Sequence, residues 1–297
     1  MSEVFQTNGS CFITLNKAAC ISSASALNRL KNLLKLKKAG FCGTLDPLAK
    51  GVIVVATGKA TKLISLVTDS DKIYSGKMIL GYESASFDKD TELVPTGVEF
   101  DLSKVDLREI EKKFTGYVKQ TPPAYSAVKI DGVRAYKLAR QGECPEIKER
   151  TVFMNRISLS VSSDTEISFS IECSKGTYIR SLVNDIGKHI GCGAVMAELL
   201  RERVGGFDLA HSVTIDEIKN DISSVERGVT EIDAFLKRFK TLDVDRNSYD
   251  WLRNGKDIAA LKLELSEGLN YIRFENEPAF VIKSEADSFS YFAYLRD

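Results

Sequence analysis

The chain has few of the side chains that build metal centres or support thiol chemistry. Its 297 residues include only two histidines, and its six cysteines fall singly, mostly inside apolar stretches. No two of these cysteines have the spacing of zinc ligands or of a redox pair. We therefore expect no metal site, and we interpret the cysteines as buried free thiols in a reducing compartment.

Other common signatures are also missing. The N-terminus lacks the basic region and apolar run of a signal peptide, and no apolar stretch approaches membrane-spanning length. No Ser/His/Asp set is evident, and the GKAT segment at residues 58–61 lacks the upstream glycine of a Walker motif. These absences predict a cytoplasmic protein, without membrane contact, whose chemistry uses few side chains and no cofactor.

Carboxylates are nearly absent from one long segment. The chain has 41 basic and 41 acidic residues, yet residues 4–68 hold nine Lys or Arg and a single carboxylate, Asp46. Nearby positive charge favours the ionised form of a carboxyl group, and it attracts polyanions. The pattern predicts that an ionised Asp46 acts on a phosphate-bearing substrate. Chance clustering of charge on solvated helices is the alternative.

A second basic stretch lies between residues 119 and 140, where five basic residues accompany Asp131 alone. The compensating acids concentrate at residues 83–111, 216–233 and 264–287. The net charge of zero gives no hint of nucleic acid. The segregation nevertheless indicates one basic face for a polyanion.

Hydrophobic periodicity predicts both strands and helices. The expected strands are residues 11–15, 51–56, 72–80, 151–161 and 165–173, and the expected helices are 24–38, 103–114 and 178–190. Residues 194–203 fit either a helix or a strand, and residues 214–239 look helical and acidic. A hairpin is expected around Asp131-Gly132.

Three residues are candidates for chemistry. Gly43 permits a tight turn and Pro47 biases Asp46 toward an extended conformation, which would present the carboxylate from a constrained loop. An Asp-Pro turn without any function is the alternative. Arg180 falls in the first turn of the 178–190 helix, where cations are disfavoured, so it needs either a substrate phosphate or a buried carboxylate unless it is a tolerated surface residue. Tyr74 shares an apolar strand face, which fits a cleft residue or a core tyrosine.

The sequence resembles the TruB family of pseudouridine synthases at five ordered motifs, from about Cys11 to Phe207. They are GTLDPLAKG at residues 43–51, TKL at 61–63, DKIY at 71–74, TPPAYSAVK at 121–129 and CSKGTYIRSL at 173–182. The resemblance implies isomerisation of uridine 55 in the T-loop of tRNA to pseudouridine, without a cofactor. Residues 241–297 weakly resemble the PUA-type RNA-binding module that this family often carries.

The resemblance also implies roles for individual residues. Asp46 matches the nucleophile that attacks the flipped uridine, Arg180 its ion-pair partner, and Tyr74 the tyrosine that stacks on the base and assists proton removal from C5. Leu199 matches the leucine that packs against the base. The expected substrate-binding residues are Leu199, Phe41, Lys17, Lys62, Tyr178, Lys129 and Arg140.

Some positions depart from the family pattern. Phe41 stands where many members have a histidine that fills the gap left by the flipped base, and it can stack but not hydrogen-bond. Ala18 replaces a proline, Cys20 replaces a glycine, and the 83–90 loop, whose Asp88 matches an acidic position, diverges. These changes affect positioning more than chemistry, so we expect an active enzyme.

The expected fold is α+β: a mixed, mainly antiparallel central sheet with a catalytic cleft and flanking helices, followed by a small β domain. Residues 1–239 would form the catalytic domain, with an insertion at about 120–142 that grips the T-loop, and residues 240–297 the small domain. The expected partner is the T-arm of tRNA, with no protein partner and a monomeric chain.

Three other functions are possible. A guide-RNA-dependent relative shares the same Asp, Tyr and Arg. A non-catalytic protein that binds or folds tRNA would not need Asp46. A glycosidase-type hydrolase is disfavoured because the basic segment supplies no second acid.

Overall fold

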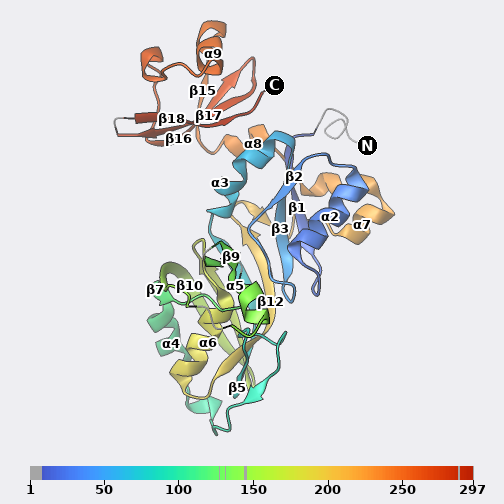
Figure 1. The fold of residues 1–297 in the computed structure, drawn as a ribbon, viewed down its shortest axis with the longest axis vertical. Coiled ribbons are helices and arrows are strands. Elements are labelled where there is room, and N and C mark those ends of the chain that lie inside the picture. Colours follow the sequence, from blue (N-terminus) through green and yellow to red (C-terminus); the bar gives the residue numbers. More distant parts are fainter. Residues whose placement is uncertain (1–8, 127, 131, 144–145, 287, 297) are drawn as a thin grey trace.

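The computed structural model describes residues 9–126, 128–130, 132–143, 146–286 and 288–296. Two sheets dominate the elongated molecule (Figure 1). The larger sheet runs through its middle and lower parts, and a smaller sheet near the C-terminus forms the upper part. None of the described helices is both long and apolar enough to cross a membrane.

The large sheet is mixed and mainly antiparallel, as expected. Its order is β14-β1-β3-β12-β4-β11-β10-β7, with β2 added to β3 and β13 to β12. Only the short β3–β12 pairing is parallel among those recorded for this sheet in the described residues. Its strands are β1 (Cys11–Lys17), β2 (Ala39–Cys42), β3 (Lys50–Thr57), β4 (Lys72–Leu80), β7 (Gly116–Gln120), β10 (Arg150–Ser163), β11 (Glu166–Cys173), β12 (Ala194–Val204), β13 (Phe207–Asp208) and β14 (Val229–Glu231).

Short helices surround the sheet. The α-helices are α2 (Ser23–Leu34), α3 (Ile64–Thr68), α4 (Leu107–Phe114), α5 (Ala135–Arg140), α6 (Ile179–Ile190), α7 (Ile215–Asn220), α8 (Ile232–Leu236) and α9 (Arg246–Arg253). The 3-10 helices are η1 (Gly58–Leu63), η2 (Leu102–Lys104), η3 (Ile222–Gly228) and η4 (Ala259–Leu261). Helix α6 packs its Leu182, Val183 and Ile186 face into the main core beside β12.

The first helix is shorter than its pattern predicts. Ser22 caps α2 by accepting a hydrogen bond from the Ser25 backbone N–H, as its position suggested. The helix ends at Leu34 because Lys35 takes a left-handed conformation with φ 52°. Gly40 lies further along the chain in β2, a strand that the hydrophobic periodicity did not predict.

One open alternative is now settled, and two other expectations need correction. Residues 194–203 are resolved as strand β12, whose buried positions fit the centre of a sheet. The helix expected from residue 103 begins only at Leu107, where Asp106 supplies the N-cap. The 214–239 stretch breaks into α7, η3, β14 and α8, because Asp221 caps a new turn and β14 pairs with β1.

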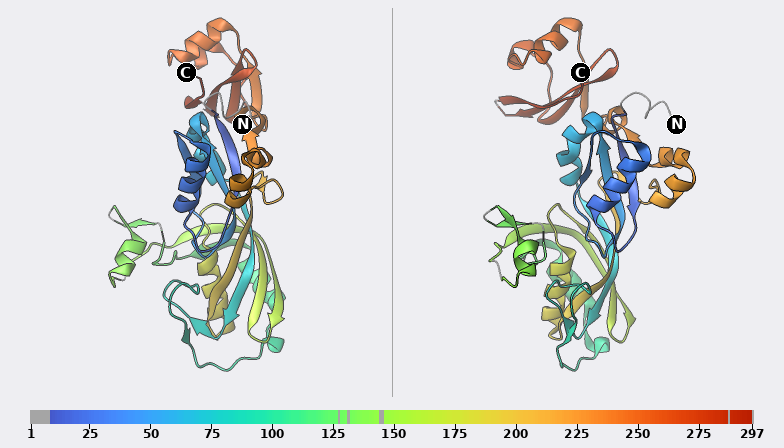
Figure 2. Two further views of the ribbon diagram at one scale, coloured as in Figure 1. Left: turned by 90° about the vertical axis from the view of Figure 1, so that its right-hand side faces the viewer. Right: turned by 45° about the vertical axis from the view of Figure 1, so that its right-hand side comes forward.

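The segment at residues 120–142 projects from the large sheet as an arm (Figure 2, left). It contains the expected hairpin, in which β8 (Lys129–Ile130) pairs with β9 (Val133–Arg134), followed by α5. Asp131 itself lies outside the described residues. A separate two-stranded sheet is formed by β5 (Tyr82–Glu83) and β6 (Val94–Pro95).

The C-terminal sheet has the order β15-β16-β17-β18 and contacts the large sheet through apolar side chains. Its strands are β15 (Lys240–Asp243), β16 (Gly268–Phe274), β17 (Glu277–Glu285) and β18 (Ser288–Tyr294). Tyr271 and Val281 join one buried cluster with Phe12, Phe207 and Phe235 of the larger part. The small β domain is therefore seated on the β1–β3 end of the large sheet.

The cysteines are mostly, but not all, buried. Cys11, Cys42, Cys173 and Cys192 are buried free thiols, whereas Cys20 is exposed. Cys20 adopts a left-handed φ of 62°, and its backbone N–H donates to the Pro47 carbonyl at 2.8 Å. Its side chain consequently stays outside the core, and the prediction of burial was wrong for this residue. Cys144 lies outside the described residues.

Gly51 permits the parallel contact between β3 and β12. Its φ is 111°, and a Cβ there would lie 2.3 Å from the Arg201 carbonyl oxygen. We expect Gly51→Ala to lower the free energy of unfolding by about 2 to 3 kcal/mol, because backbone atoms would have to move. Urea denaturation measures this loss. Gly206→Ala, where a Cβ meets nothing within 4 Å, is the matched control. Equal effects of the two changes would contradict the argument.

Candidate active site

The loop between β2 and β3 presents Asp46 on a fixed turn. The Ser23 hydroxyl donates to the Leu45 carbonyl and accepts from the Leu45 N–H, both at 2.9 Å. The Ala49 N–H donates to the Asp46 carbonyl at 3.2 Å. The Asp46 side chain is 31% exposed. The carboxylate is thus rigidly placed yet open to a substrate.

Arg180, at the start of α6, holds that carboxylate from the other side. Its Nε lies 2.8 Å from Asp46 Oδ2 and its Nη2 3.2 Å from Oδ1. The guanidinium also donates to the carbonyls of Ser86 at 2.9 Å and Tyr125 at 3.0 Å. The side chain is only 5% exposed, so this two-pronged pair is largely shielded from water. The anionic partner that the helix position required is therefore Asp46.

A second carboxylate, Asp88, faces the same guanidinium. Its Oδ2 lies 3.5 Å from Arg180 Nε, and its side chain is 3% exposed. The Ser86 hydroxyl and the Asp90 N–H donate to its other oxygen. Burial raises the pKa of the Asp88 carboxyl, while the bond from Ser86 and the charge of Arg180 oppose that rise. The Ser86–Asp88 segment therefore forms the back wall that fixes Arg180.

Tyr74 and Leu199 line the neighbouring strands β4 and β12. Both are buried, at 8% and 5% exposure. Leu199 lies opposite Gly76 in the register, two residues from Tyr74. Burial raises the pKa of the Tyr74 phenol, with Arg201 acting in the opposite direction. This geometry supplies an apolar wall and a hydroxyl beside the loop that carries Asp46.

Lys17 supports the loop from beneath. It is 1% exposed, and its Nζ donates to the carbonyls of Ala18 at 2.8 Å, Ile21 at 2.9 Å and Pro47 at 3.2 Å. Burial lowers the pKa of the Lys17 ammonium to about 8, while the charge of Asp46 opposes that change. The side chain binds the residue after Asp46 rather than facing solvent.

The remaining predicted residues fall in different places. Phe41 is half-buried in β2 against the main core, and Tyr178 precedes Arg180, with its backbone N–H and carbonyl both bonded to the Gln120 side chain. Lys62 is directed toward the small domain, where its Nζ donates to the Tyr294 carbonyl at 2.5 Å. The side chains of Lys129 and Arg140 lie outside the described part of the chain.

Two arginines escaped the sequence analysis. Arg201 is almost fully buried and donates to the Gly43 and Thr44 carbonyls of the Asp46 loop. Arg150 stacks on Tyr178, with its guanidinium carbon 4.4 Å from the ring centre. Arg201 carried no distinguishing signal, because Glu198, Glu202 and Arg203 are also charged residues of β12. Arg150, the first residue of β10, carried no distinguishing pattern either.

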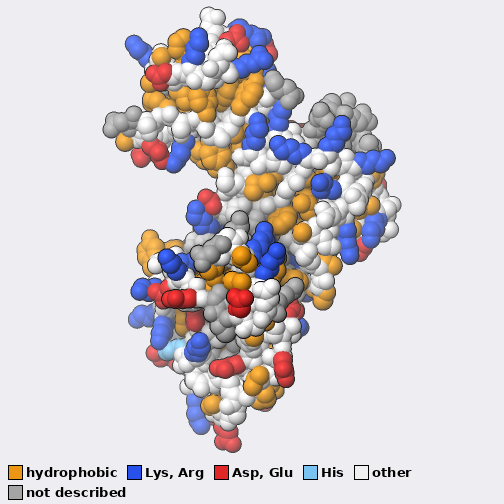
Figure 3. Space-filling view, in the orientation of Figure 1, with side chains coloured by type: hydrophobic (Ala, Val, Ile, Leu, Met, Phe, Trp, Pro, Cys, Tyr) orange, Lys and Arg blue, Asp and Glu red, His pale blue; other side chains and the backbone are white. Residues whose placement is uncertain are grey.

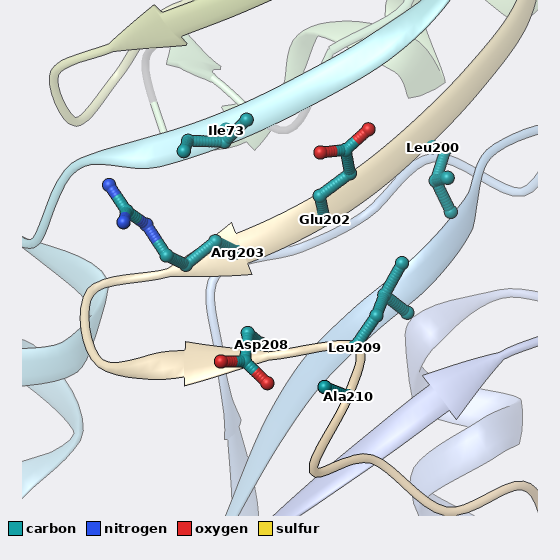
Figure 4. Close-up of a pocket in the computed structure, with 7 residues that line it drawn as sticks. All are labelled: Ile73, Leu200, Glu202, Arg203, Asp208, Leu209 and Ala210. Atoms are coloured by element: carbon teal, nitrogen blue, oxygen red, sulfur yellow. The ribbon is translucent and has the colours of Figure 1, made fainter.

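No group of three or more His, Cys, Asp or Glu side chains that could hold a metal ion occurs among the described residues. A surface depression lies away from the Asp46–Arg180 pair, along β4, β12 and β13 (Figure 4). Its lining includes Arg203, Asp208 and Leu209. The chemistry-bearing groups therefore gather at the Asp46 loop.

The described site combines one partly exposed carboxylate, a buried guanidinium that holds it, and a buried tyrosine on a neighbouring strand. Residues 31–179 match the N-terminal domain of the TruB family pseudouridylate synthases, and residues 180–241 match the tRNA pseudouridylate synthase B C-terminal domain. The chain belongs to the TruB family.

Curated relatives cover most of the chain. It is similar to tRNA pseudouridine synthase B of Lactobacillus delbrueckii subsp. bulgaricus, with 36% identity over 88% of this chain and 90% of the relative. The same-named protein of Pseudomonas putida strain F1 is 40% identical over 82% of this chain and 77% of the relative. The motifs that predicted the family are thus confirmed.

Solved structures share the fold. An H/ACA RNP bound to a substrate RNA containing 2'-deoxyuridine aligns with a TM-score of 0.71 at 20% identity, over 100% of this chain and 88% of that one. A Cbf5-Nop10-Gar1 complex aligns with a TM-score of 0.70 at 22% identity, over 100% and 87%. At this identity the similarity concerns the fold, including the small C-terminal β domain.

The raised pKa of Asp88 predicts a pH effect on stability. A carboxyl whose pKa is higher in the folded state contributes stability below its unfolded-state pKa, and that contribution is lost as pH rises through the folded-state pKa. Asn at position 88 does not titrate. The free energy of unfolding of Asp88→Asn minus that of the parent should therefore rise from about pH 4 to about pH 7.

Urea titrations across this range measure the difference. Asp101→Asn is the matched control, because side-chain hydrogen bonds from Ser103 and Lys104 lower the pKa of the exposed Asp101 carboxyl. The corresponding difference for Asp101→Asn should change mainly below about pH 4 and stay nearly constant from about pH 5 to about pH 7. A flat or falling curve for Asp88→Asn would overturn the assignment.

Proposed function

We propose that this protein isomerises uridine 55 in the T-loop of tRNA to pseudouridine. The observation that carries the proposal is the Asp46–Arg180 pair, which combines a 31% exposed carboxylate with a 5% exposed guanidinium. The relatives at 36–40% identity, all named tRNA pseudouridine synthase B, support tRNA as the substrate. Neither a metal nor a cofactor enters the proposed reaction.

Asp46 acts as the nucleophile. A carboxylate must be ionised to attack, and the adjacent guanidinium favours that form. Attack on the ribose C1′ or on C6 of the base leads to cleavage of the bond to N1. The base then turns and rejoins the ribose through C5. The covalent bond to Asp46 breaks, the C5 proton leaves and N1 takes up a proton, so the Asp46 carboxylate is regenerated. Arg180 holds the Asp46 carboxylate in position throughout.

Tyr74 and Leu199 hold the flipped base. Extruding a nucleotide from its stack costs a few kcal/mol, which contacts with an aromatic ring and an apolar wall can offset. Tyr74 stacks on the base and assists removal of the C5 proton. Phe41, half-buried in β2, contributes an apolar surface in place of a hydrogen-bonding side chain.

The charge distribution fits an RNA partner. Lys and Arg side chains gather on the upper part of the face shown in Figure 3, and helix α2 and its end carry exposed Arg29, Lys35, Lys37 and Lys38. The arm adds Arg134 and Lys137, both exposed, and we propose that it grips the T-loop together with Lys129 and Arg140. We propose further that the chain works as a cytoplasmic monomer, with residues 1–239 catalytic and 240–297 binding RNA.

The guide-RNA-dependent alternative is weaker. The solved complexes of that kind share 20–22% identity with this chain, whereas the tRNA enzymes share 36–40%. A bare T-arm hairpin without guide RNA separates the two functions, because only a stand-alone enzyme modifies it.

The decisive experiment incubates a uridine-containing T-arm hairpin with the protein and maps pseudouridine. We expect conversion at the position of uridine 55, and a loss of at least about 10³-fold in single-turnover rate for Asp46→Asn, since the nucleophile is removed. RNA affinity should survive. Asp216→Asn, a surface change on α7 at an 85% exposed side chain, is the control. Full activity of Asp46→Asn, or binding without any conversion, would reject the enzyme.

Arg150 predicts a phosphate contact near the site. Its Nε and Nη2 are buried without a hydrogen-bond partner among the described residues, and burial lowers the pKa of its guanidinium. An anionic group of the RNA would satisfy both atoms. Arg150→Met should weaken RNA binding and reduce the salt slope of the logarithmic affinity by about 1.

Affinity for the hairpin at several salt concentrations tests this contact. Lys219→Met is the control, because its ammonium already pairs with Asp216 at 3.0 Å. An unchanged slope for Arg150→Met would remove Arg150 from the RNA-binding surface.

A further inference from the structure

Arg201 occupies an unusual position behind the catalytic loop. It lies in β12 directly opposite Tyr74 of β4. Residues paired in this way have Cβ atoms about 4.5 to 5.5 Å apart on one face of a sheet. Arg201 is 1% exposed and Tyr74 8%. The guanidinium and the phenol therefore share one interior space.

Three hydrogen bonds of Arg201 go to backbone carbonyls. Its Nε donates to Val52 at 2.7 Å, its Nη2 to Gly43 at 3.2 Å and its Nη1 to Thr44 at 3.4 Å. These bonds tie β12 to β3 and to the turn that leads to Asp46. They fix the distance between the catalytic loop and the strand of Tyr74.

No ion pair forms at Arg201 within the described residues, in contrast to Arg180, which faces two carboxylates. A buried charge without a counter-ion costs several kcal/mol, which carbonyl dipoles offset only in part. Retaining a guanidinium here is costly for a residue that only ties strands together. The positive charge of Arg201 would stabilise a negative charge that develops nearby.

The groups around Arg201 and Tyr74 identify where that charge can form. Their ionisable neighbours are Lys17 of β1, Cys42 of β2, Lys72 of β4, Cys173 of β11 and Asp46 of the loop. Asp46 is already engaged by Arg180. Burial raises the pKa of the Tyr74 phenol and of both thiols, and Arg201 is the largest influence that opposes this rise at Tyr74.

We propose that Arg201 is a positioning residue for Tyr74, and that it stabilises the phenolate through which Tyr74 accepts the C5 proton. The inference rests on the proposed function and extends it. The phenol first loses its proton to solvent. The phenolate oxygen then forms a bond to the C5 proton, the electrons of the C5–H bond return to the ring as a double bond, and Tyr74 becomes neutral again.

Two substitutions separate charge from tethering. Arg201→Gln keeps an amide donor for the carbonyls and removes the positive charge. Arg201→Lys keeps the positive charge and loses the planar guanidinium that bonds several carbonyls at once. Arg203→Gln is the matched control two residues further along β12. Figure 4 shows Arg203 beside Ile73, in the surface depression, and it bonds to Glu172 at 2.9 Å. Ile73 and Tyr74 are consecutive in β4, so their side chains point to opposite faces.

The first readout needs no RNA. With 3-fluorotyrosine at position 74, the ¹⁹F chemical shift followed against pH gives the acidity of that phenol directly. We expect Arg201→Gln to raise the midpoint by about one pH unit or more, which is a tenfold smaller phenolate fraction. Arg201→Lys and Arg203→Gln should leave it nearly unchanged. An unmoved midpoint in Arg201→Gln, or equal shifts for Gln and Lys, would overturn the proposal.

The second readout is the single-turnover rate on the T-arm hairpin. Arg201→Gln should lose about 10-fold or more, and a more acidic trifluorotyrosine at position 74 should restore part of that loss. A rate loss that the fluorinated tyrosine does not restore would show a structural role only, and would count against the proposal. If the parent protein makes no pseudouridine, the proposed function fails, and the ¹⁹F titration still decides whether Arg201 controls Tyr74.

Discussion

The ion pair between Asp46 and Arg180 is the interaction on which the site depends. It joins a loop near the start of the chain to a helix start 134 residues later. Placing a guanidinium in the first turn of α6 opposes the helix dipole, and burying it costs several kcal/mol more. Two carboxylates and two carbonyls around one side chain offset that cost. The loops that supply them are ordered by the same contacts.

The cations around Asp46 divide into three kinds. Arg180 is paired with carboxylates, Lys17 and Arg201 are held by backbone carbonyls, and the arm and α2 carry exposed basic side chains. The first kind sets the direction of the carboxylate. The second fixes the loop and leaves positive charge uncompensated in the interior. The third can meet phosphates. The Asp46 carboxylate thus contacts the first kind of cation and lies on a loop that the second kind holds.

The sequence alone predicted the site residues that stand out from their immediate neighbours in the chain. Asp46 stood out as the lone acid in a basic segment, and Arg180 as a cation at a helix start. Arg201 could not be predicted as a site residue, because strand and helix fitted residues 194–203 equally well. Only its pairing with Tyr74 in the sheet shows that it lies at the site. The contact of Lys62 with Tyr294 spans 232 residues, which no local pattern encodes.

The irregularity in β12 shows how finely the site depends on register. Arg201 pairs with Tyr74, yet Arg203 pairs with Ile73, so one extra residue is accommodated between them. In a regular strand, positions 201 and 203 would share a face. The bulge instead sends Arg201 into the interior and Arg203 to the surface depression. Gly51 allows the Arg201 backbone to approach, because a Cβ at position 51 would lie only 2.3 Å from the Arg201 carbonyl oxygen. A one-residue slip would exchange the faces of the two arginines and leave the Asp46 loop without its tether, so the position of Arg201 depends on this backbone irregularity.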